Sequence, residues 1–268
     1  MAHQHLTEML DLDVEVLHDH HREVIALAGT LVPAEPHIID LGAGTGAGTL
    51  ALARQLSDAQ LTAVDIDDEM LAHLRHRATE LGVGQRIRTV RADLDDTWPT
   101  DLGPADLIWA SAAMHHFADP ARALGQARAA LRPGGAIMIT ELDSFPKFLS
   151  DPVGSAIEDR CHDEMARHRA AAGMHMNEDW GAHLTAAGFV AEAERRFDID
   201  LRAPLPQRAL RYAQVCLSRM GERLGDRLSR VDLATLGDIA ANLSEQDLVI
   251  RATRLVWIGR VPRSVPSP

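Results

Sequence analysis

A run of alternating glycines has the spacing that points most directly to chemistry in this sequence. Residues 37–48 read His-Ile-Ile-Asp-Leu-Gly-Ala-Gly-Thr-Gly-Ala-Gly, so a short apolar segment leads straight into four glycines. Glycine permits a sharp turn, and it lets the backbone approach a ligand where a Cβ atom would collide with it. The segment therefore predicts a cofactor-binding loop. Its expected contacts with the cofactor are Gly42, Ala43, Gly44 and Gly46.

Three acidic residues stand at or just after the ends of three successive predicted strands. Asp40 lies two residues before the first glycine, Asp65 follows the run 61–64, and Asp93 follows the run 87–90. A carboxylate after the second strand can accept hydrogen bonds from two ribose hydroxyls. A carboxylate beside the glycines would repel a pyrophosphate, but not a ligand that carries sulfonium and ammonium groups. These positions favour S-adenosylmethionine as the cofactor.

The third of these carboxylates has a suggested partner on the same cofactor. Asp93 can accept a hydrogen bond from an adenine amino group, and the apolar side chains of Ile66 and Leu94 are available to flank the adenine ring. A dinucleotide is the alternative cofactor, because Gly42, Gly44 and Ala47 also satisfy the Gly-x-Gly-x-x-Gly/Ala pattern. An NAD(P)-dependent oxidoreductase, or a module that binds S-adenosylmethionine without transferring its methyl group, therefore stays an alternative function.

Two adjacent histidines and one glutamate are the candidates for acid–base chemistry. His115 and His116 follow the apolar segment 107–110, and Glu141 follows the segment 136–139. Ligands of open parallel sheets bind at the carboxyl ends of the strands, so we expect these side chains beside the cofactor. A base is needed only where the methyl acceptor must lose a proton. Packing of the loop by the histidines, and a helix cap or an arginine partner for Glu141, are the alternative interpretations.

The N-terminal segment is rich in histidine, which raises the question of a metal site. In a helix, His18 and His21 share one face while His20 turns away from it. Zinc usually takes three or four ligands from one compact set. We therefore expect no metal ion, and we interpret these histidines and Asp19 as a solvent-exposed polar face.

Short apolar segments alternate with amphipathic ones from residue 37 to about residue 141. The pattern predicts strands at 38–41, 61–64, 87–90, 107–110 and 136–139, with helices between them. Continuously apolar strands are typical of a parallel sheet that helices cover on both faces. The alternation of strands and helices itself predicts a doubly wound α/β fold. Asp67 and Asp119 are expected to cap two of the helices, the second with Pro120 at its first position.

The rhythm of the elements changes on either side of this core, which divides the chain into segments. They are a helical lid over 1–36, the cofactor-binding core over 37–142, a helical cap insertion over 143–176, the completion of the core over 177–262 with a second helical insertion at 202–246, and a tail over 263–268. We expect the helical segments to cover a ligand. Asn177 is expected to cap a helix that holds Trp180 and Leu184.

Taken together, these motifs resemble those of the class I S-adenosylmethionine-dependent methyltransferases. The resemblance rests, in chain order, on Asp40–Gly48, Asp65, Asp93-Leu94, Asp106–Ser111 and Leu131-Arg-Pro-Gly-Gly135. The last of these motifs, with the histidine pair upstream of it, looks like the small-molecule branch of the family. The resemblance implies a mostly parallel, seven-stranded Rossmann-like sheet with helical cap insertions. Its sixth strand and antiparallel seventh strand would then be 189–201 and 249–261.

The resemblance also implies roles for the residues of the site. Asp40 and the glycines would hold the methionine part of the cofactor, with Ser111 beside it. Asp65 would hold the ribose, and Asp93 the adenine amino group. The segment 110–114 lacks the Asp/Asn-Pro-Pro-aromatic tetrapeptide of methyltransferases that act on nucleic-acid amines.

Composition narrows the function further. The chain has 268 residues, of which 46% are hydrophobic and 25% charged, the balance of an ordinary globular protein. Its net charge of −12 argues against binding to nucleic acid, which needs a basic face. No run of apolar residues is long enough for a bilayer, and no leader-like segment opens the chain, so a cytoplasmic location is expected. We predict a methyltransferase that acts on an O, N or C atom of a small, partly apolar molecule, and a homodimer is compatible with the sequence.

Overall fold

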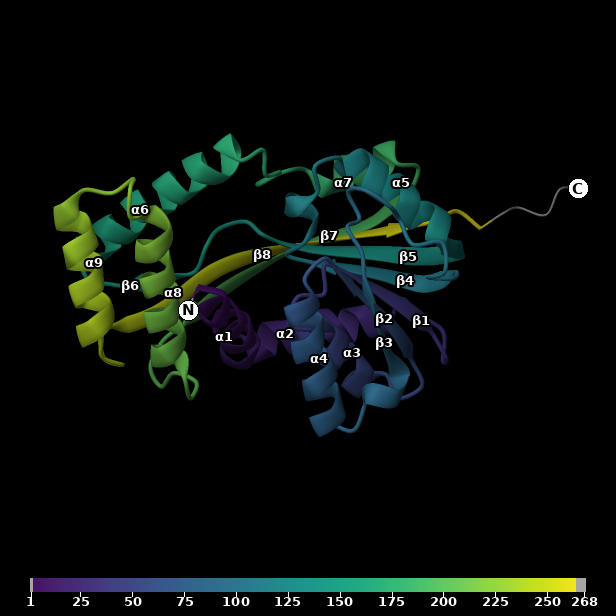
Figure 1. Cartoon of the computed structure of the whole chain (residues 1–268), viewed down its shortest axis with the longest axis horizontal. Helices are drawn as coiled ribbons and strands as arrows, with labels where there is room; N and C mark the ends of the chain where they lie inside the picture. The colour runs from purple at the N-terminus through teal and green to yellow at the C-terminus, as the bar shows by residue number, and fades with distance from the viewer. Residues whose placement is uncertain (1, 264–268) are drawn as a thin grey trace, which may run out of the picture. The chain divides into compact units, whose positions relative to one another are not determined.

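The computed structural model describes residues 2–263, so the predicted tail at 263–268 lies outside the described residues from 264 onward (Figure 1). The chain forms two compact units, each assembled from segments that are far apart in the sequence. Unit 1 contains the residues up to His21, Asp143–Met176 and Phe197–Arg254. Unit 2 contains Arg22–Leu142, Asn177–Arg196 and the residues from Leu255 onward. Within residues 2–263, every helix is too short or too polar to span a lipid bilayer.

The centre of unit 2 is a parallel β-sheet. Its first five strands are β1 (His37–Leu41), β2 (Gln60–Asp65), β3 (Ile87–Arg91), β4 (Ala105–Ser111) and β5 (Leu131–Leu142). They lie in the order β3-β2-β1-β4-β5, and each neighbouring pair is parallel. Apart from Asp40, the interior of β1 and residues 107–110 of β4 are apolar and buried because the sheet is covered on both faces. The doubly wound α/β fold predicted from the sequence is confirmed.

The helices of unit 2 cover the two faces of this sheet. They are α3 (Ala47–Gln55), α4 (Asp68–Glu80), α5 (Pro120–Ala130) and α7 (Trp180–Ala186), with short 3₁₀ turns η1 (Gly84–Arg86) and η2 (Met114–His116). Figure 1 shows α3 and α4 on one side of the strands and α5 and α7 together on the other side.

Two of the three helix caps predicted from the sequence are present in the structure, and the third is a different residue. Asp67 accepts hydrogen bonds from the N–H groups of Glu69 and Met70, and Asp119 accepts one from Arg122 N, so both predicted caps are confirmed. The prediction for Asn177 is wrong, because Asp179 is the cap of α7 and accepts from Ala182 N. Asn177 instead adopts a left-handed conformation with φ +60° in the turn before it, which asparagine tolerates better than most residues.

Strands β7 (Val190–Leu201) and β8 (Leu248–Arg260) pair with each other and pass from one unit into the other. β8 is the neighbour of β5 in the sheet. Their bounds lie within a residue of the segments 189–201 and 249–261 that the sequence indicated. The described residues contain one strand more than the seven expected, β6 (Lys147–Leu149), which is antiparallel to β8. Three residues are too few to show the alternation by which a strand is recognised.

Unit 1 is mainly helical. Its helices α1 (Ala2–Val16), α6 (Pro152–Ala171), α8 (Ala209–Leu224) and α9 (Arg230–Asn242) pack on one another around a hydrophobic cluster. Leu12, Phe148 and Leu217 are fully buried in this cluster. The periodic apolar residues of α8 supply one wall of it, which is the packing that a 3.6-residue period predicts.

The N-terminal segment, expected to be helical, forms two helices. α1 ends at Val16 and α2 (His18–Gly29) begins two residues later, so all four residues of the expected polar face lie in α2. His20 is only 8% exposed and packs edge-on against Phe197, with 5.0 Å between ring centroids. Burial lowers the pKa of His20 to about 4. The predicted solvent-exposed face is therefore wrong at His20.

A polar network joins α1, α2, α8 and β8 within unit 1. Asp13 accepts hydrogen bonds from Tyr212 Oη at 2.5 Å, from Arg254 at 3.2 Å and from the Nε2 atom of His21 at 3.2 Å. Burial alone would raise the pKa of Asp13, but Arg254, His21 and Tyr212 outweigh it and hold that pKa well below its ordinary value. The network fixes the N-terminal helices to the rest of unit 1.

A buried carboxyl group accepts hydrogen bonds from the backbone of the short strand β6. The two oxygens of Glu158, on α6, accept hydrogen bonds from Phe148 N at 2.7 Å and Leu149 N at 2.9 Å. Glu158 is fully buried, and burial raises its pKa to about 7 although the two N–H donors and Lys147 act in the opposite direction. The folded protein therefore holds a proton on Glu158 at pH values where the unfolded chain has released it.

The contribution of Glu158 to the stability of the protein should accordingly fall as the pH rises from about 4.5 to about 7, the window between its unfolded and folded pKa values. Across this window the contribution of Glu158 to the free energy of unfolding falls by roughly 3 kcal/mol. Urea unfolding at a series of pH values measures it, and Glu158→Gln should reduce the slope because the amide does not titrate. The exposed acid Glu245 provides the control, since Glu245→Gln should keep the native slope. An unchanged slope in Glu158→Gln would contradict this explanation.

The residue that precedes α3 makes a second prediction. Gly46 has φ +81°, and a Cβ atom added to it would lie 2.1 Å from the Cδ1 atom of Leu74 on α4. Gly46→Ala should therefore cost more than the roughly 1–2 kcal/mol of a left-handed alanine, because α3 and α4 must separate. Gly103 has φ +72° with open space around it, so Gly103→Ala should cost only the conformational part. Equal shifts in the urea midpoint for the two variants would show that the contact with Leu74 is unimportant.

Candidate cofactor site and family

The predicted site residues come together because the first five strands are parallel and end at one edge of the sheet. β1 leads into the glycine loop, and β2 ends at Asp65. β3 ends at Arg91, which is two residues before Asp93. β4 ends at Ser111, and Glu141 lies near the end of β5. This is the edge at which open α/β sheets bind ligands.

The glycine loop adopts the backbone conformation that its sequence predicts. Gly42, Gly44 and Gly46 have φ values of +67°, +54° and +81°, which L-residues with a Cβ atom seldom adopt. The N–H groups of Gly42 and Ala43 donate to the carbonyl of Val64 at 2.9 and 3.1 Å, so the loop is fastened to the end of β2. The loop is thereby shaped by hydrogen bonds of the protein itself.

Asp65 fixes this loop from the neighbouring strand. Its Oδ2 atom accepts from Gly44 N at 2.7 Å and its Oδ1 atom accepts from Asp67 N at 2.9 Å. A carboxylate has about four acceptor positions, so each oxygen keeps one for a further donor. The next residue, Ile66, is 56% exposed, which is unusual for so large an apolar side chain. Asp65 and Ile66 thus offer acceptors beside an apolar surface.

Asp40 is placed differently from the other two carboxylates. It is 3% exposed, and its Oδ2 atom accepts from the hydroxyl of Thr49 at 2.5 Å. Burial raises the pKa of Asp40 to about 7, against the lowering effect of the bond to Thr49 and with the help of the nearby charge of Asp65. The hydrogen bond ties β1 to α3. The expectation that Asp40 contacts the methionine part of the cofactor stays a prediction.

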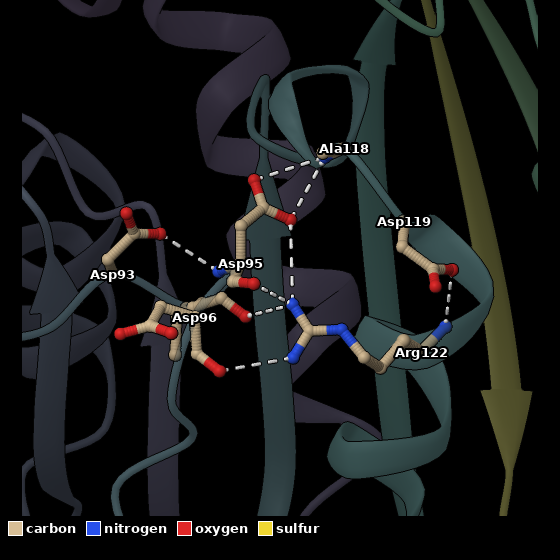
Figure 2. Close-up of polar contacts among 7 residues, drawn as sticks. Asp93, Asp95, Asp96, Ala118, Asp119 and Arg122 are labelled. Atoms are coloured by element: carbon tan, nitrogen blue, oxygen red, sulfur yellow. Dashed lines mark hydrogen bonds and ion pairs between the residues drawn. The ribbon is translucent and has the colours of Figure 1, made fainter.

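Asp93 lies in the loop that follows β3, and Figure 2 shows its surroundings. The side chain is exposed, and its Oδ1 atom accepts from Asp95 N at 2.9 Å. Leu94 is 6% exposed and belongs to the hydrophobic core of unit 2. Of the two apolar residues expected to flank an adenine ring, only Ile66 is open to a ligand.

The histidine pair and Glu141 form a compact group at the ends of β4 and β5. Glu141 accepts a hydrogen bond from the Nδ1 atom of His115 at 2.6 Å and a longer one from its backbone N–H at 3.3 Å. His115 and Glu141 are both 4% exposed. A carboxylate oxygen only accepts, so Nδ1 is the protonated ring nitrogen of His115. The partner of Glu141 is thus a histidine rather than an arginine, and its longer hydrogen bond comes from a backbone N–H in the first turn of η2.

His116 is the exposed member of the pair. Its ring lies 4.2 Å from that of His115, centroid to centroid, so the anchored ring supports the exposed one. The turn before them is unusual because Ala112 has φ +51°, and Ala112 N donates to the carbonyl of Thr140 at 2.7 Å. Backbone outliers of this kind gather at functional sites. Ser111, directly before this turn, is partly exposed.

Several residues that shape this edge were not singled out from the sequence. Thr49 holds Asp40, Asp95 docks the loop after β3, and Arg122 binds that loop from α5. Asp95 stands in an acidic run at 93–96, and Arg122 stands three residues after the cap of α5. These positions are visible in the sequence, but their contacts depend on long-range packing that no local spacing shows.

Of the four aromatic side chains Phe145, Phe148, Trp180 and Tyr212, three lie in the hydrophobic cores of the two units. Phe148 and Tyr212 are buried in the cluster of unit 1, whereas Trp180 is buried in the core of unit 2. Phe145 lies under the guanidinium of Arg169, with 3.9 Å from its central carbon to the ring centroid. Burial accounts for three of the four side chains.

Comparison with known proteins gives a consistent result. Residues 38–135 match the family model of the methyltransferase domain. The biotin biosynthesis bifunctional protein BioCD of Bordetella avium is 36% identical over 134 residues, 48% of this chain and 27% of that protein. Trans-aconitate 2-methyltransferase of Variovorax paradoxus is 34% identical over 121 residues, 44% of this chain and 43% of that protein. The 27-O-demethylrifamycin SV methyltransferase of Amycolatopsis mediterranei is 26% identical, over 62% of this chain and 59% of that protein.

Solved structures are similar in fold over nearly the whole chain. A crystal structure from Bacillus halodurans C-125 has a TM-score of 0.59 at 16% identity and covers 90% of this chain and 98% of its own. The phosphoethanolamine N-methyltransferase 2 of Haemonchus contortus, in complex with S-adenosyl-L-methionine, has a TM-score of 0.52 at 16% identity and covers 90% and 53%.

The matched region spans less than two thirds of the length of each of the three sequence relatives, so the activities in their names are those of the relatives. The region that matches the family model contains the glycine loop, strands β1–β4 and the start of β5. The match decides between the two cofactor classes that the glycine loop allowed. Residues 38–135 are therefore similar to methyltransferase domains, and the likeness of the whole chain to solved structures is a likeness of fold.

Proposed function

We propose that this protein transfers the methyl group of S-adenosylmethionine to an O, N or C atom of a small, partly apolar molecule. The observation that carries the proposal is the edge of the sheet where a left-handed glycine loop meets carboxylates from three neighbouring strands. This set of hydrogen-bond acceptors suits a ligand with two ribose hydroxyls, an amino group and positive charge. A pyrophosphate would meet carboxylates instead of the basic groups it requires.

Different residues of this edge are assigned to different parts of the cofactor. Asp65 would accept from the ribose hydroxyls with the acceptor positions that Gly44 and Asp67 leave unused. Asp93 would accept from the adenine amino group, with Ile66 along the ring. The methionine part would lie on the glycine loop, close to Ser111 and with Asp40 beneath it. These assignments are the ones that the family resemblance implies for the strand ends on which the residues stand.

The bound cofactor supplies a methyl carbon that its positive sulfur has already activated for in-line displacement. The protein therefore contributes mainly by holding the acceptor atom in line, and a base is required only for an acceptor that carries a proton. His116 is the exposed candidate for that base. Glu141 holds the loop of His116 in place, because it accepts hydrogen bonds from the backbone N–H and from the Nδ1 atom of His115.

The acceptor is proposed to be a small molecule for two reasons. The net charge of −12 disfavours nucleic acid. The named relatives include a methyltransferase of trans-aconitate and one of a rifamycin, both small molecules of unlike chemistry. Because these two acceptors differ so much, they do not identify the one used here.

Asp65→Ala should weaken the binding of S-adenosylhomocysteine by roughly 2–3 kcal/mol, because paired charge-assisted hydrogen bonds to the ribose are lost. Isothermal titration calorimetry measures the dissociation constant directly. Asp68→Ala is the matched control, since Asp68 is an exposed acid three residues further along. A dissociation constant that stays native in Asp65→Ala would place the ribose elsewhere.

Methyl transfer itself is tested with radiolabelled S-adenosylmethionine in a cell extract, followed by mass identification of the labelled product. A small labelled product supports the proposal, and a labelled nucleic acid or no labelled product contradicts it. With the product in hand, His116→Ala should lower kcat by roughly 10²–10⁴-fold if His116 is the base, with cofactor affinity little changed. Equal losses in kcat and in cofactor affinity would instead assign His116 to binding.

A further inference from the structure

Three successive peptide groups of the loop after β3 turn their carbonyls towards one arginine. Arg122, on α5, donates from one terminal nitrogen to the carbonyl of Leu94 at 3.3 Å and to that of Asp95, and from the other to that of Asp96 at 3.4 Å (Figure 2). The same guanidinium lies 3.9 Å from the carboxylate of Asp95. Arginine is suited to this task because its five N–H donors are fixed in one plane.

The N–H groups of the same three peptides turn towards Asp93. Asp95 N donates to the Oδ1 atom of Asp93 at 2.9 Å, and the N–H groups of Asp96 and Thr97 donate to the Asp93 carbonyl at 3.1 and 3.0 Å. In a trans peptide the C=O of one residue and the N–H of the next point in opposite directions across one rigid plane. Arg122 and Asp93 therefore hold opposite ends of three shared planes.

The guanidinium of Arg122 and the acceptors of Asp93, its carboxylate for one plane and its carbonyl for the other two, act on these planes in the same sense. A peptide unit carries a dipole of about 3.5 D, and here its negative end faces the guanidinium while its positive end faces the aspartate. Each interaction orients the group that the other one uses, so the two reinforce each other. The loss of Arg122 would free the three planes to rotate and would weaken the donor that fixes the Asp93 carboxylate.

Two further contacts keep Arg122 in register with this loop. Both carboxylate oxygens of Asp95 accept from Ala118 N, at 2.9 and 3.0 Å, so the loop is docked just before α5. Asp119 caps α5 by accepting from the backbone N–H of Arg122 itself at 2.9 Å (Figure 2). The start of α5 and the loop after β3 thus form one hydrogen-bonded body.

We infer that Arg122 is a positioning residue that aims the carboxylate of Asp93 and so sets the recognition of the purine base of the cofactor. This inference rests on the proposed function, which assigns the adenine amino group to Asp93. Arg122 does not itself need to touch the cofactor. Its effect should therefore appear in the choice between purines, which a general loss of stability would not alter.

The test compares the binding of S-adenosylhomocysteine and S-inosylhomocysteine by calorimetry. The inosyl compound carries a carbonyl oxygen where adenosine has its amino group, so an aimed carboxylate rejects it. The native protein should prefer the adenosyl compound by roughly tenfold or more. The inosyl compound offers no hydrogen-bond donor to the carboxylate of Asp93, so that carboxylate would stay unpaired. Arg122→Met keeps much of the side chain's length and removes its donors, and it should bring this preference close to one.

Arg128 provides the matched control. It stands on the same helix, is similarly half-buried and donates to the carbonyl of Gly188 at 3.1 Å, away from the loop. Arg128→Met should keep the native preference. If Arg122→Met does not fold, Arg122→Lys takes its place, because the lysine keeps the charge but cannot engage three carbonyls at once.

The outcomes separate the inference from the proposed function. If the native protein distinguishes the two compounds and the Arg122 variant binds both more weakly by the same factor, the inference is overturned while the proposed function stands. If the native protein binds both equally, the role of Asp93 and the inference fall together. If it binds neither compound, the proposed function itself is contradicted, and the inference falls with it.

Discussion

The hydrogen bond from Gly44 N to the carboxylate of Asp65 is the interaction on which the rest of the site depends. It joins the loop after β1 to the end of β2, and it holds the glycines in a conformation that an L-residue would resist. The same carboxylate keeps acceptor positions for a ligand. The parallel order of β1–β5 then places the acid–base group of β4 and β5 at this edge of the sheet as well. The candidate site is thus a consequence of strand direction together with one bridging carboxylate.

The same device recurs through both units of the chain. Glu141 accepts from the backbone of His115, Asp95 from that of Ala118, and Glu158 from those of Phe148 and Leu149. In each case a carboxylate side chain accepts hydrogen bonds from backbone N–H groups, a task that backbone carbonyls perform within strands and helices. Part of the acidic excess of this sequence is therefore structural. That use of acids does not conflict with a cationic cofactor, because carboxylates that shape such a loop also favour positive charge beside it.

The sequence predicts well what depends on local pattern. The five parallel strands, the caps Asp67 and Asp119 and the last two strands follow from apolar periodicity and from short-range hydrogen bonds. It predicts less well what depends on packing between distant segments. The burial of His20 against Phe197, the burial of Leu94 in the core and the hold of Arg122 on the loop after β3 join residues far apart in the chain. The three-residue strand β6 was missed because its pairing with β8, not its own sequence, makes it a strand.

The most direct test is a crystal structure of the protein soaked with S-adenosylhomocysteine, supported by calorimetry with NAD⁺ as the competing ligand. We expect the adenosyl compound on the glycine loop, with its ribose hydroxyls on Asp65 and its amino group on Asp93, and no measurable binding of NAD⁺. An empty loop, or a nicotinamide nucleotide bound there in preference, would contradict the central claim that these carboxylates form the site of a cationic adenosyl cofactor.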